Sequence, residues 1–374
     1  MIDVGEALER ESHRFRQEPG ASERLTRRRD RKRRNERVGA AAVAVSLSVA
    51  LIGALMFGYR SRGVPSAPPG FVQNGRIAFS RWYSADPGPI FVTYLANRDG
   101  SDVRRLPGGA SWQPFPRWSP DGRQVAVTEP RAETPQCPKD VICTTVIVDV
   151  ETGAYRGIPW TLPGTWDVDC FPWSPDATRL ACGAIDDNGT DLSGIYTVRA
   201  SDGGDPVRIT PCGPCVPGDF SPDGRRLVFS SLDPDGHLAL FVVGLDGGGL
   251  RRITPEGMVP NGVDGGRWSP AGDRIVFQAR KAPDRQYSIW VVNPEGGDLQ
   301  QIPIEGCGGS LSAAGSGACR MPAWSPDGTK IVFSYRSQTE TSVAGLYVVN
   351  ADGSGLARLT NDGRDDQPDW GTNP

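Results

Sequence analysis

The chain contains 374 residues with a net charge of −3, and it carries only two histidines and eight cysteines. This charge hides two opposite parts, because residues 1–62 carry a net charge of +6 and the remainder carries −9. The acidic part argues against nucleic acid as a partner, and two histidines leave little material for a zinc site.

The N-terminal region has the pattern of a membrane anchor. Residues 38–58 form 21 consecutive positions without a charge, long enough to cross a bilayer as a helix. Nine arginines or lysines lie within residues 24–37, which predicts a cytoplasmic N-terminus and contact with anionic lipid. A cleaved signal peptide is the alternative, although such signals usually have a short basic lead. We expect a cytoplasmic tail over 1–37, an uncleaved single-pass helix over 38–58 and a Pro/Gly linker over 59–72.

The rest of the chain, residues 73–374, contains a repeated unit. The sequence WSPDG or a variant begins at five aromatic residues, and an apolar β-type triplet starts seven positions after each of them: Trp118, Trp173, Phe220, Trp268 and Trp324. The Pro and Asp suit a type I turn, and the Gly suits the left-handed position that closes a three-residue hairpin loop. A third apolar strand and a short fourth strand follow in most copies. Four strands in a repeat of about fifty residues predict a β-propeller blade.

Counting the copies predicts six blades, one of which is split between the two ends of the sequence. Residues 75–80 have the second-strand pattern without a preceding WSPDG, whereas Trp370 lies in a first strand that no second strand follows. We predict that the C-terminal strand completes the N-terminal blade and leaves no open sheet edge. The expected architecture is an all-β, six-bladed β-propeller over 73–374, preceded by a single transmembrane α-helix.

The blade pattern also resembles a known family. PxWSPDGxxIxF, a GLYVVN-type strand and LARLT together resemble the WD40-like repeat of TolB-like six-bladed propellers, and residues 359–370 resemble that family's junction between blades. The chain departs from the pattern at Ala177, which replaces Gly, and at Ala271, which replaces Asp. The resemblance implies the fold. Similar propellers serve as docking scaffolds, as substrate gates of serine peptidases and occasionally as enzymes, so the function must be argued from the site.

All eight cysteines lie in the part that we expect to be exported, and an even number outside the cytoplasm predicts disulfides. The simplest pairing is local: Cys137–Cys143, Cys170–Cys182, Cys212–Cys215 and Cys307–Cys319. If the turn after Trp173 has a three-residue loop, Trp173 lies opposite Arg179 and Cys170 lies opposite Cys182. Two free thiols filling a space that holds Phe in three sister blades are the alternative for that pair. A redox motif or half a zinc site is the alternative for the CGPC sequence at 212–215.

The sequence offers little for catalysis. A GxSxG nucleophile elbow does not occur. His237 is the one histidine outside the N-terminal tail, and it follows DPDG in a predicted hairpin loop. Residues 186–191 are rich in carboxylates, but their spacing does not match an EF-hand calcium loop. We therefore predict no catalytic residues, no metal site and no cofactor.

Candidate ligand contacts are aromatic and charged residues near the first strands of the blades, where inter-blade loops approach the channel mouth. They are Trp112, Trp166, Asp169, Arg267, Asp365 and Asp366. Such groups around a concave mouth suit a protein, or an envelope glycan or peptide. Ordinary loop packing is the alternative for each of them.

Three functions fit these observations. The first is a monomeric, non-enzymatic scaffold, anchored in the cell membrane with its propeller outside the cytoplasm, that binds a protein or envelope ligand. The second is a transmembrane sensor that signals through residues 1–37, a tail that resembles the short cytoplasmic leaders of membrane proteins near sigma-factor systems (anti-sigma-like). The third is an enzyme that acts on glycan or peptide. Binding is the simplest of the three, because no nucleophile–base pair is recognisable.

Overall fold

The computed structural model describes residues 73–374 except 86–89, 109–113, 129–144, 160–164, 187–190, 263, 282–285, 309–316 and 338–343, and it leaves the side chains of 165–169 undescribed. The predicted tail, anchor and linker in residues 1–72 lie outside these ranges. Every regular element in the described ranges is a strand. None of these residues belongs to a helix that is long and apolar enough for a bilayer.

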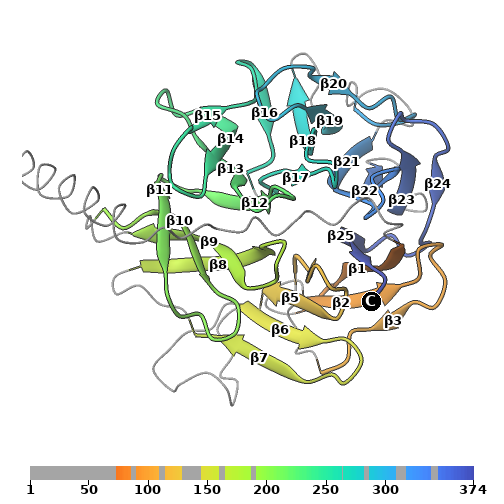
Figure 1. The fold of residues 1–374 in the computed structure, drawn as a ribbon. Coiled ribbons are helices and arrows are strands. Elements are labelled where there is room, and N and C mark those ends of the chain that lie inside the picture. Colours follow the sequence, from red (N-terminus) through yellow and green to blue (C-terminus); the bar gives the residue numbers. More distant parts are fainter. Residues whose placement is uncertain are drawn as a thin grey trace, which may run out of the picture. The chain divides into compact units, whose positions relative to one another are not determined.

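Six antiparallel sheets stand in a ring in the described part of the chain (Figure 1). Blade 1 contains β25 (Asp365–Thr372), β1 (Asn74–Tyr83), β2 (Ile90–Ala96) and β3 (Arg104–Arg105), and blade 2 contains β4 (Arg117–Trp118), β5 (Gln124–Thr128), β6 (Thr145–Asp149) and β7 (Tyr155–Ile158). Blade 3 contains β8 (Thr165–Trp173), β9 (Arg179–Asp186), β10 (Gly194–Arg199) and β11 (Val207–Pro211), and blade 4 contains β12 (Val216–Phe220), β13 (Arg226–Leu232), β14 (Leu238–Gly244) and β15 (Arg251–Arg252). Blade 5 contains β16 (Met258–Pro260), β17 (Arg267–Trp268), β18 (Ile275–Lys281), β19 (Ser288–Val292) and β20 (Gln300–Gln301), and blade 6 contains β21 (Gly317–Trp324), β22 (Lys330–Ser337), β23 (Gly345–Asn350) and β24 (Ala357–Arg358).

The ring closes through the C-terminal strand, as the sequence predicts. In Figure 1, β25 (blue) lies beside β1 (orange). The two strands pair antiparallel, with Trp370 opposite Ile77 and Asp365 opposite Arg81. The indole N–H of Trp370 also donates a hydrogen bond to the carbonyl of Gly75 at 3.3 Å. The C-terminal strand therefore covers the edge of β1 that would otherwise be unpaired.

The turn after each motif aromatic is longer than predicted. In blade 2, the amide of Ser119 donates to the carbonyl of Gln124, and the amide of Gly122 donates back to the carbonyl of Ser119. Four residues, 120–123, therefore separate the two strands, so the prediction of a three-residue loop is wrong. The Ser119 hydroxyl accounts for the extra residue, because it accepts a hydrogen bond from the amide of Gln124 at 2.9 Å.

The two departures from the turn motif are accommodated locally. Ala177 adopts the left-handed backbone, with φ of 58°, that glycine provides elsewhere. In blade 5, where Ala271 replaces Asp, the hydroxyl of Ser269 donates to Asp273 at 2.8 Å. The turn thus keeps a Ser–Asp hydrogen bond by using a carboxylate two residues later in the chain.

Three of the four predicted disulfides lie in the described residues, and all three are formed: Cys170–Cys182, Cys212–Cys215 and Cys307–Cys319. Cys137 and Cys143 lie outside the described residues. Cys170 does pair with Cys182 across the sheet, but Trp173 faces Leu180 rather than Arg179. An irregularity in β8 between Cys170 and Trp173 compensates for the longer turn. The predicted pair is therefore confirmed although its predicted register is wrong.

Apolar side chains between neighbouring blades form the core. Phe79, Phe229, Phe277 and Phe333 occupy equivalent positions in four blades and are almost fully buried. Each such burial stabilises the fold by about 1.5–3 kcal/mol. Neighbouring blades also approach closely at Gly371, where a Cβ atom would lie 2.6 Å from the ring of Trp118. Glycine at this position lets the indole of blade 2 lie directly against the inner strand of blade 1.

Candidate binding channel

The inner strands of the six blades enclose a cavity of about 380 Å³, which is within the range of ligand pockets. Its wall includes the motif aromatic of every blade: Trp118, Trp173, Phe220, Trp268, Trp324 and Trp370. Prolines of the turns that follow line it as well: Pro120, Pro175, Pro222, Pro270 and Pro326. We call the side of the ring that carries these turns the turn face. The cavity is the turn-face end of the propeller channel.

The residue immediately before each motif aromatic also lines this cavity, and four of these six residues are charged, so we call the six positions the ring of charges. In order around the propeller from blade 1 to blade 6 they are Asp369, Arg117, Pro172, Asp219, Arg267 and Ala323. An acid, a base and an uncharged residue thus follow one another twice around the ring. The six blades share one fold, but their channel has an approximate twofold pattern of charge.

The two carboxylates of this ring connect neighbouring blades. Asp369 accepts a hydrogen bond from the amide of Trp118 at 2.8 Å, and Asp219 accepts one from the amide of Trp268 at 3.1 Å. Both carboxylates keep some accessible surface, because they face the cavity. Burial by the surrounding blades, together with the negative charge of Asp369, raises the pKa of Asp219 to about 8. Burial also raises the pKa of Asp369.

Arg267, which the sequence predicts as a ligand contact, is held firmly in place. Its Nη1 donates to the carbonyl of Gly218 at 2.8 Å, and its Nη2 lies 3.7 Å from Asp264 Oδ1. Asp264 is only 2% exposed, and its oxygens have no hydrogen-bond partner within the described residues. Burial raises the pKa of Asp264 to about 7, although the positive charge of Arg117 opposes this shift. Asp264 is the carboxylate partner of Arg267 within blade 5.

Arg117 occupies the equivalent position in blade 2 but has no such partner. Asp264 lies three residues before Arg267, whereas Pro114 lies three residues before Arg117. Arg117 is 7% exposed, and its Nη1 donates a hydrogen bond to the carbonyl of Pro116 at 3.3 Å. No carboxylate within the described ranges lies at ion-pair distance, and its Nε has no acceptor there. Burial lowers the pKa of this guanidinium, opposed by the more distant charge of Asp369.

Two other predicted residues, Asp365 and Asp366, lie at the opposite end of β25 and hold the ring closed. Asp365 accepts two hydrogen bonds from Arg81 of β1, at 2.6 and 3.1 Å. Asp366 accepts from the hydroxyl of Ser334 at 2.5 Å and from Arg336 at 3.0 Å, both in β22. These carboxylates therefore tie β25 to blade 1 and to blade 6. Neither lines the cavity at the turn face.

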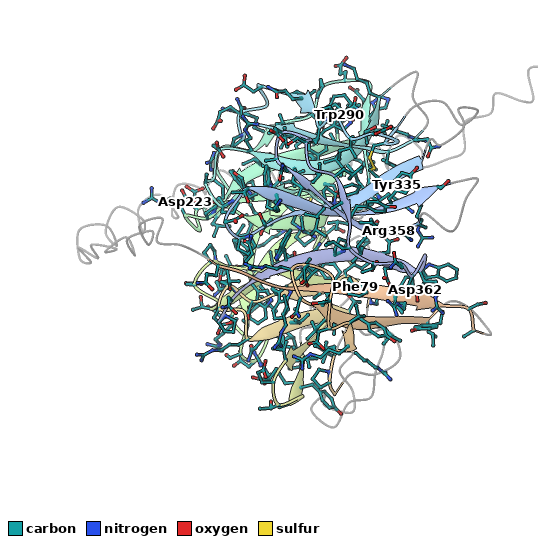
Figure 2. The ribbon with its side chains drawn as sticks, turned by 90° about the vertical axis from the view of Figure 1, so that its right-hand side faces the viewer. Phe79, Asp223, Trp290, Tyr335, Arg358 and Asp362 are labelled. Carbon is teal, nitrogen blue, oxygen red and sulfur yellow. A yellow bond between two sulfur atoms is a disulfide. The ribbon has the colours of Figure 1, made fainter. Side chains whose placement is uncertain are left out.

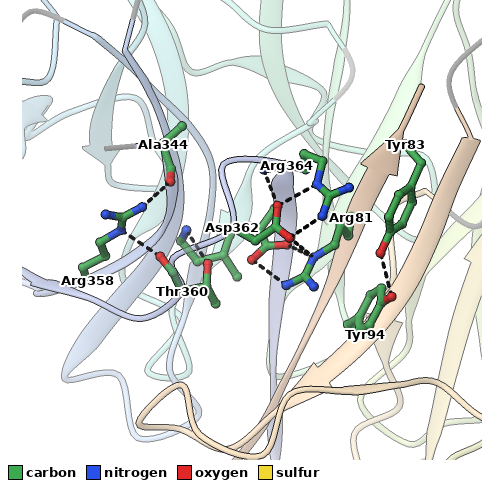
Figure 3. A network of polar contacts seen from close by, with 10 residues as sticks. Arg81, Tyr83, Tyr94, Ala344, Arg358, Thr360, Asp362 and Arg364 are labelled. Carbon is green, nitrogen blue, oxygen red and sulfur yellow. Dashed lines mark hydrogen bonds and ion pairs between the residues drawn. The ribbon is translucent and has the colours of Figure 1, made fainter. Parts of the chain in front are cut away.

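A wider network surrounds this closure (Figure 3). Asp362 receives two hydrogen bonds from Arg364, at 2.7 and 2.8 Å, and lies 3.4 Å from Arg81. The guanidinium of Arg364 stacks over the ring of Tyr83, and the hydroxyls of Tyr83 and Tyr94 lie 2.7 Å apart. In Figure 2, Asp362 is on the right of the propeller, whereas Asp223, in a turn of the turn face, is on the left. The charged groups of this network are paired with one another, so the network stabilises the closed ring.

The remaining predicted contacts lie in parts that the structure describes incompletely. Trp112 lies outside the described residues. The backbone of Trp166 pairs with Ile185, and that of Asp169 pairs with Gly183, both within blade 3. The side chains of Trp166 and Asp169 are not described, so their roles stay predictions.

A group that could hold a metal occurs at a hairpin tip, where Asp233, Asp235 and His237 lie close together. Asp233 already accepts hydrogen bonds from the amides of Asp235 and His237 and from Arg252. The side chain of His237 is 76% exposed. This arrangement is that of a hydrogen-bonded turn, and we assign it no ion.

A second hollow, of about 920 Å³, lies between blades 5 and 6 on the turn face. It is larger than the channel cavity, but its carboxylates serve its own turns. Asp273 accepts a hydrogen bond from Ser269, and Asp327 accepts one from Ser325. The channel, where six blades converge and charged groups remain available, is the stronger candidate site.

The fold and the channel define the class of protein as a six-bladed β-propeller with a charged central cavity. Its sequence matches the TolB beta propeller domain family over residues 75–306, and the chain therefore belongs to that family.

Solved structures have the same fold. TolB from Acinetobacter baumannii is 21% identical, with a TM-score of 0.59 over 79% of this chain, which spans 66% of that protein's chain. A putative TolB from Agrobacterium tumefaciens is 18% identical, with a TM-score of 0.54 over 82% of this chain and 100% of that one. Hydrazine synthase from Kuenenia stuttgartiensis is 14% identical, with a TM-score of 0.56 over 80% of this chain and 47% of that one. At these identities the likeness concerns the fold alone.

Sequence reasoning finds Arg267 but not the ring to which it belongs. Arg117 and Arg267 are recognisable as neighbours of their motif tryptophans, whereas Asp219 and Asp369 are not noticed at the same offset, because the residue type at this position changes from blade to blade. Comparing the residue before the motif aromatic in all six blades reveals the pattern. Asp264 has the same offset from its Trp as Asp169 and Asp366, so the alignment of repeats marks this position too.

Proposed function

We propose that this chain is a binding scaffold outside the cytoplasm, a monomer anchored in the cell membrane through residues 38–58, whose channel receives a protein or envelope ligand at the turn face. The observation that carries this proposal is the cavity of about 380 Å³ that all six blades enclose. Its rim of aromatic and proline side chains provides apolar contact, and its ring of charges provides orientation, which is the usual composition of a ligand site.

Two further features support the cellular setting. Three formed disulfides suit an oxidising compartment, because disulfides are rare in the reducing cytoplasm. The uncharged segment 38–58 follows a strongly basic stretch, which is the arrangement of a membrane anchor with its N-terminus inside the cell. A non-enzymatic role is part of the proposal, since the charged side chains of the cavity include no nucleophile and base in contact.

Affinity capture with the full-length protein tests this proposal. Pro222 is an exposed proline at the rim of the cavity. A Pro222→Trp substitution should block the mouth and abolish capture of envelope partners, while the melting temperature stays near that of the wild type. Pro234 is also exposed, but it lies in the β13–β14 hairpin away from the cavity, so Pro234→Trp is the matched control. Equal capture by both variants would show that the ligand binds elsewhere.

A further inference from the structure

We propose that Arg117 makes the channel a receptor for a carboxylate, so that the ligand presents a carboxylate-bearing peptide segment to the turn face. This inference rests on the proposed binding function and specifies the chemistry of its ligand. It starts from a difference between two arginines that occupy equivalent positions in the ring of charges.

Arg267 shows what an arginine with a carboxylate at ion-pair distance looks like in this channel, although its Nε, like that of Arg117, has no acceptor within the described residues. It donates to the carbonyl of Gly218 and has Asp264 at 3.7 Å. Arg117 has a comparable burial, 7% exposed against 6%, but its partner position is Pro114. The acids whose charges act on Arg117 lie beyond ion-pair distance, so an anion in direct contact with this guanidinium would supply the hydrogen bonds that burial takes from it. Because Arg117 lines the cavity, such an anion can reach it from the turn face.

The charges around Arg117 favour a carboxylate over a phosphate. Asp369, Asp264 and Asp219 all act on the Arg117 guanidinium, so the same acids act on any anion that binds there. A dianion would suffer about twice the repulsion of a monoanion from these groups. A carboxylate also matches the planar fork of a guanidinium, which donates two parallel hydrogen bonds to it.

The walls of the cavity favour a peptide as the carrier of that carboxylate. Beside the ring of charges, the six motif aromatics and the five turn prolines line the cavity and form an apolar collar. A peptide that enters carboxylate first would place its terminal group at Arg117 and its preceding side chains against this collar.

Two measurements on the full-length protein in detergent test this assignment. The first is thermal unfolding at equal ionic strength in sodium acetate, sodium chloride and inorganic phosphate, because an anion that binds the native state raises the melting temperature. The second is calorimetric titration with acetyl-trialanine as the free acid and as the C-terminal amide. The variants are Arg117→Gln and Arg117→Lys, with Arg123→Gln as the control, since Arg123 is exposed in the turn of the same blade.

We expect acetate to stabilise the wild type and Arg123→Gln more than chloride or phosphate does, and Arg117→Gln to show no preference. The free acid should bind the wild type about tenfold or more tightly than the amide, and Arg117→Gln should remove this difference, with partial retention in Arg117→Lys. In chloride, Arg117→Gln should melt no lower than the wild type, because it removes a buried charge that has no carboxylate in direct contact; a purely structural arginine would behave in the opposite way.

Equal binding of acid and amide by the wild type, or an acetate preference that persists in Arg117→Gln, would overturn the assignment. A phosphate preference would replace the carboxylate by a phosphorylated ligand. Failure of the scaffold proposal would look different: acetate would still stabilise the wild type through Arg117, while affinity capture would find no partner that Pro222→Trp loses.

Discussion

Replacing Arg81 by Met should destabilise the propeller through its closure. Asp365 is 1% exposed and receives two hydrogen bonds from Arg81, at 2.6 and 3.1 Å, besides one from the side chain of Thr360. Removing one partner of a fully buried pair costs about 3–5 kcal/mol, because the other charge stays buried and uncompensated. The side chain of Arg81 is 15% exposed, so water reaches part of the pair. We therefore expect a loss of about 2–3 kcal/mol in the free energy of unfolding.

The partner variants separate pairing from packing. Asp365→Leu should cost less than Arg81→Met, since Arg81 keeps Asp362 at 3.4 Å. The double variant Arg81→Met/Asp365→Leu should recover most of the loss, because it leaves no buried charge. Urea unfolding measures all four proteins. Burial raises the pKa of Asp365, and Arg81 opposes this shift in the wild type. The deficit of Arg81→Met should therefore shrink as the pH falls and the orphaned carboxylate takes up a proton. A deficit below about 0.5 kcal/mol, or a double variant as unstable as the sum of the single ones, would refute the reasoning.

Three further predictions concern the ring, a disulfide and the channel acids. Deleting residues 366–374 removes most of β25 and exposes β1, so the cooperative unfolding transition seen by circular dichroism should be lost; melting like the parent would contradict the closure. Replacing Cys170 and Cys182 together by Ala opens a link between positions 12 residues apart, which should cost about 3 kcal/mol in urea unfolding without reductant, and an unchanged midpoint would show that the bridge does not form. The raised pKa of Asp219, about 8, means that the native state holds a proton that the unfolded state releases near pH 4. This contribution to stability is complete below about pH 4 and is lost as the pH rises through about 8, so Asp219→Asn should flatten the fall in melting temperature between about pH 5 and about pH 9, whereas the exposed control Asp235→Asn should not.

The fold can be predicted from the sequence because the same sequence pattern recurs from blade to blade. A turn motif, an aromatic and an apolar triplet recur at a near-constant spacing, and the two incomplete repeats at 75–80 and around Trp370 complement each other. The exact turn length is not readable, because the hydroxyl of Ser119 extends the loop by one residue through a hydrogen bond. The predicted register is wrong by one residue for this reason, because the length of the loop depends on the hydrogen bond of a single side chain.

The candidate site is harder to read because it is built across blades. Asp369 and Arg117 are 252 positions apart in the chain, yet they line one cavity. No local motif can show that the residue before each aromatic faces a common space; the ring order of the blades is needed first. For the same reason Asp365 and Asp366 resemble ligand contacts in the sequence, whereas in the fold Arg81 and Arg336 already occupy them.

The split first blade has a consequence for the order in which this protein folds. Arg81 and Asp365, which pair in the closed ring, are 284 positions apart in the chain. Until the last residues are available, β1, β2 and β3 form a sheet whose inner edge is bare, and the ring stays an open arc of blades. Contacts of such long separation form slowly, because the entropy of closing the intervening loop must be overcome first. The three disulfides join near neighbours in the chain, one within blade 3, one in the connection between blades 3 and 4, and one between the connection before blade 6 and the first strand of that blade, so these links can form before the arc closes. Completion of the propeller is therefore a late event that awaits the arrival of its C-terminal strand.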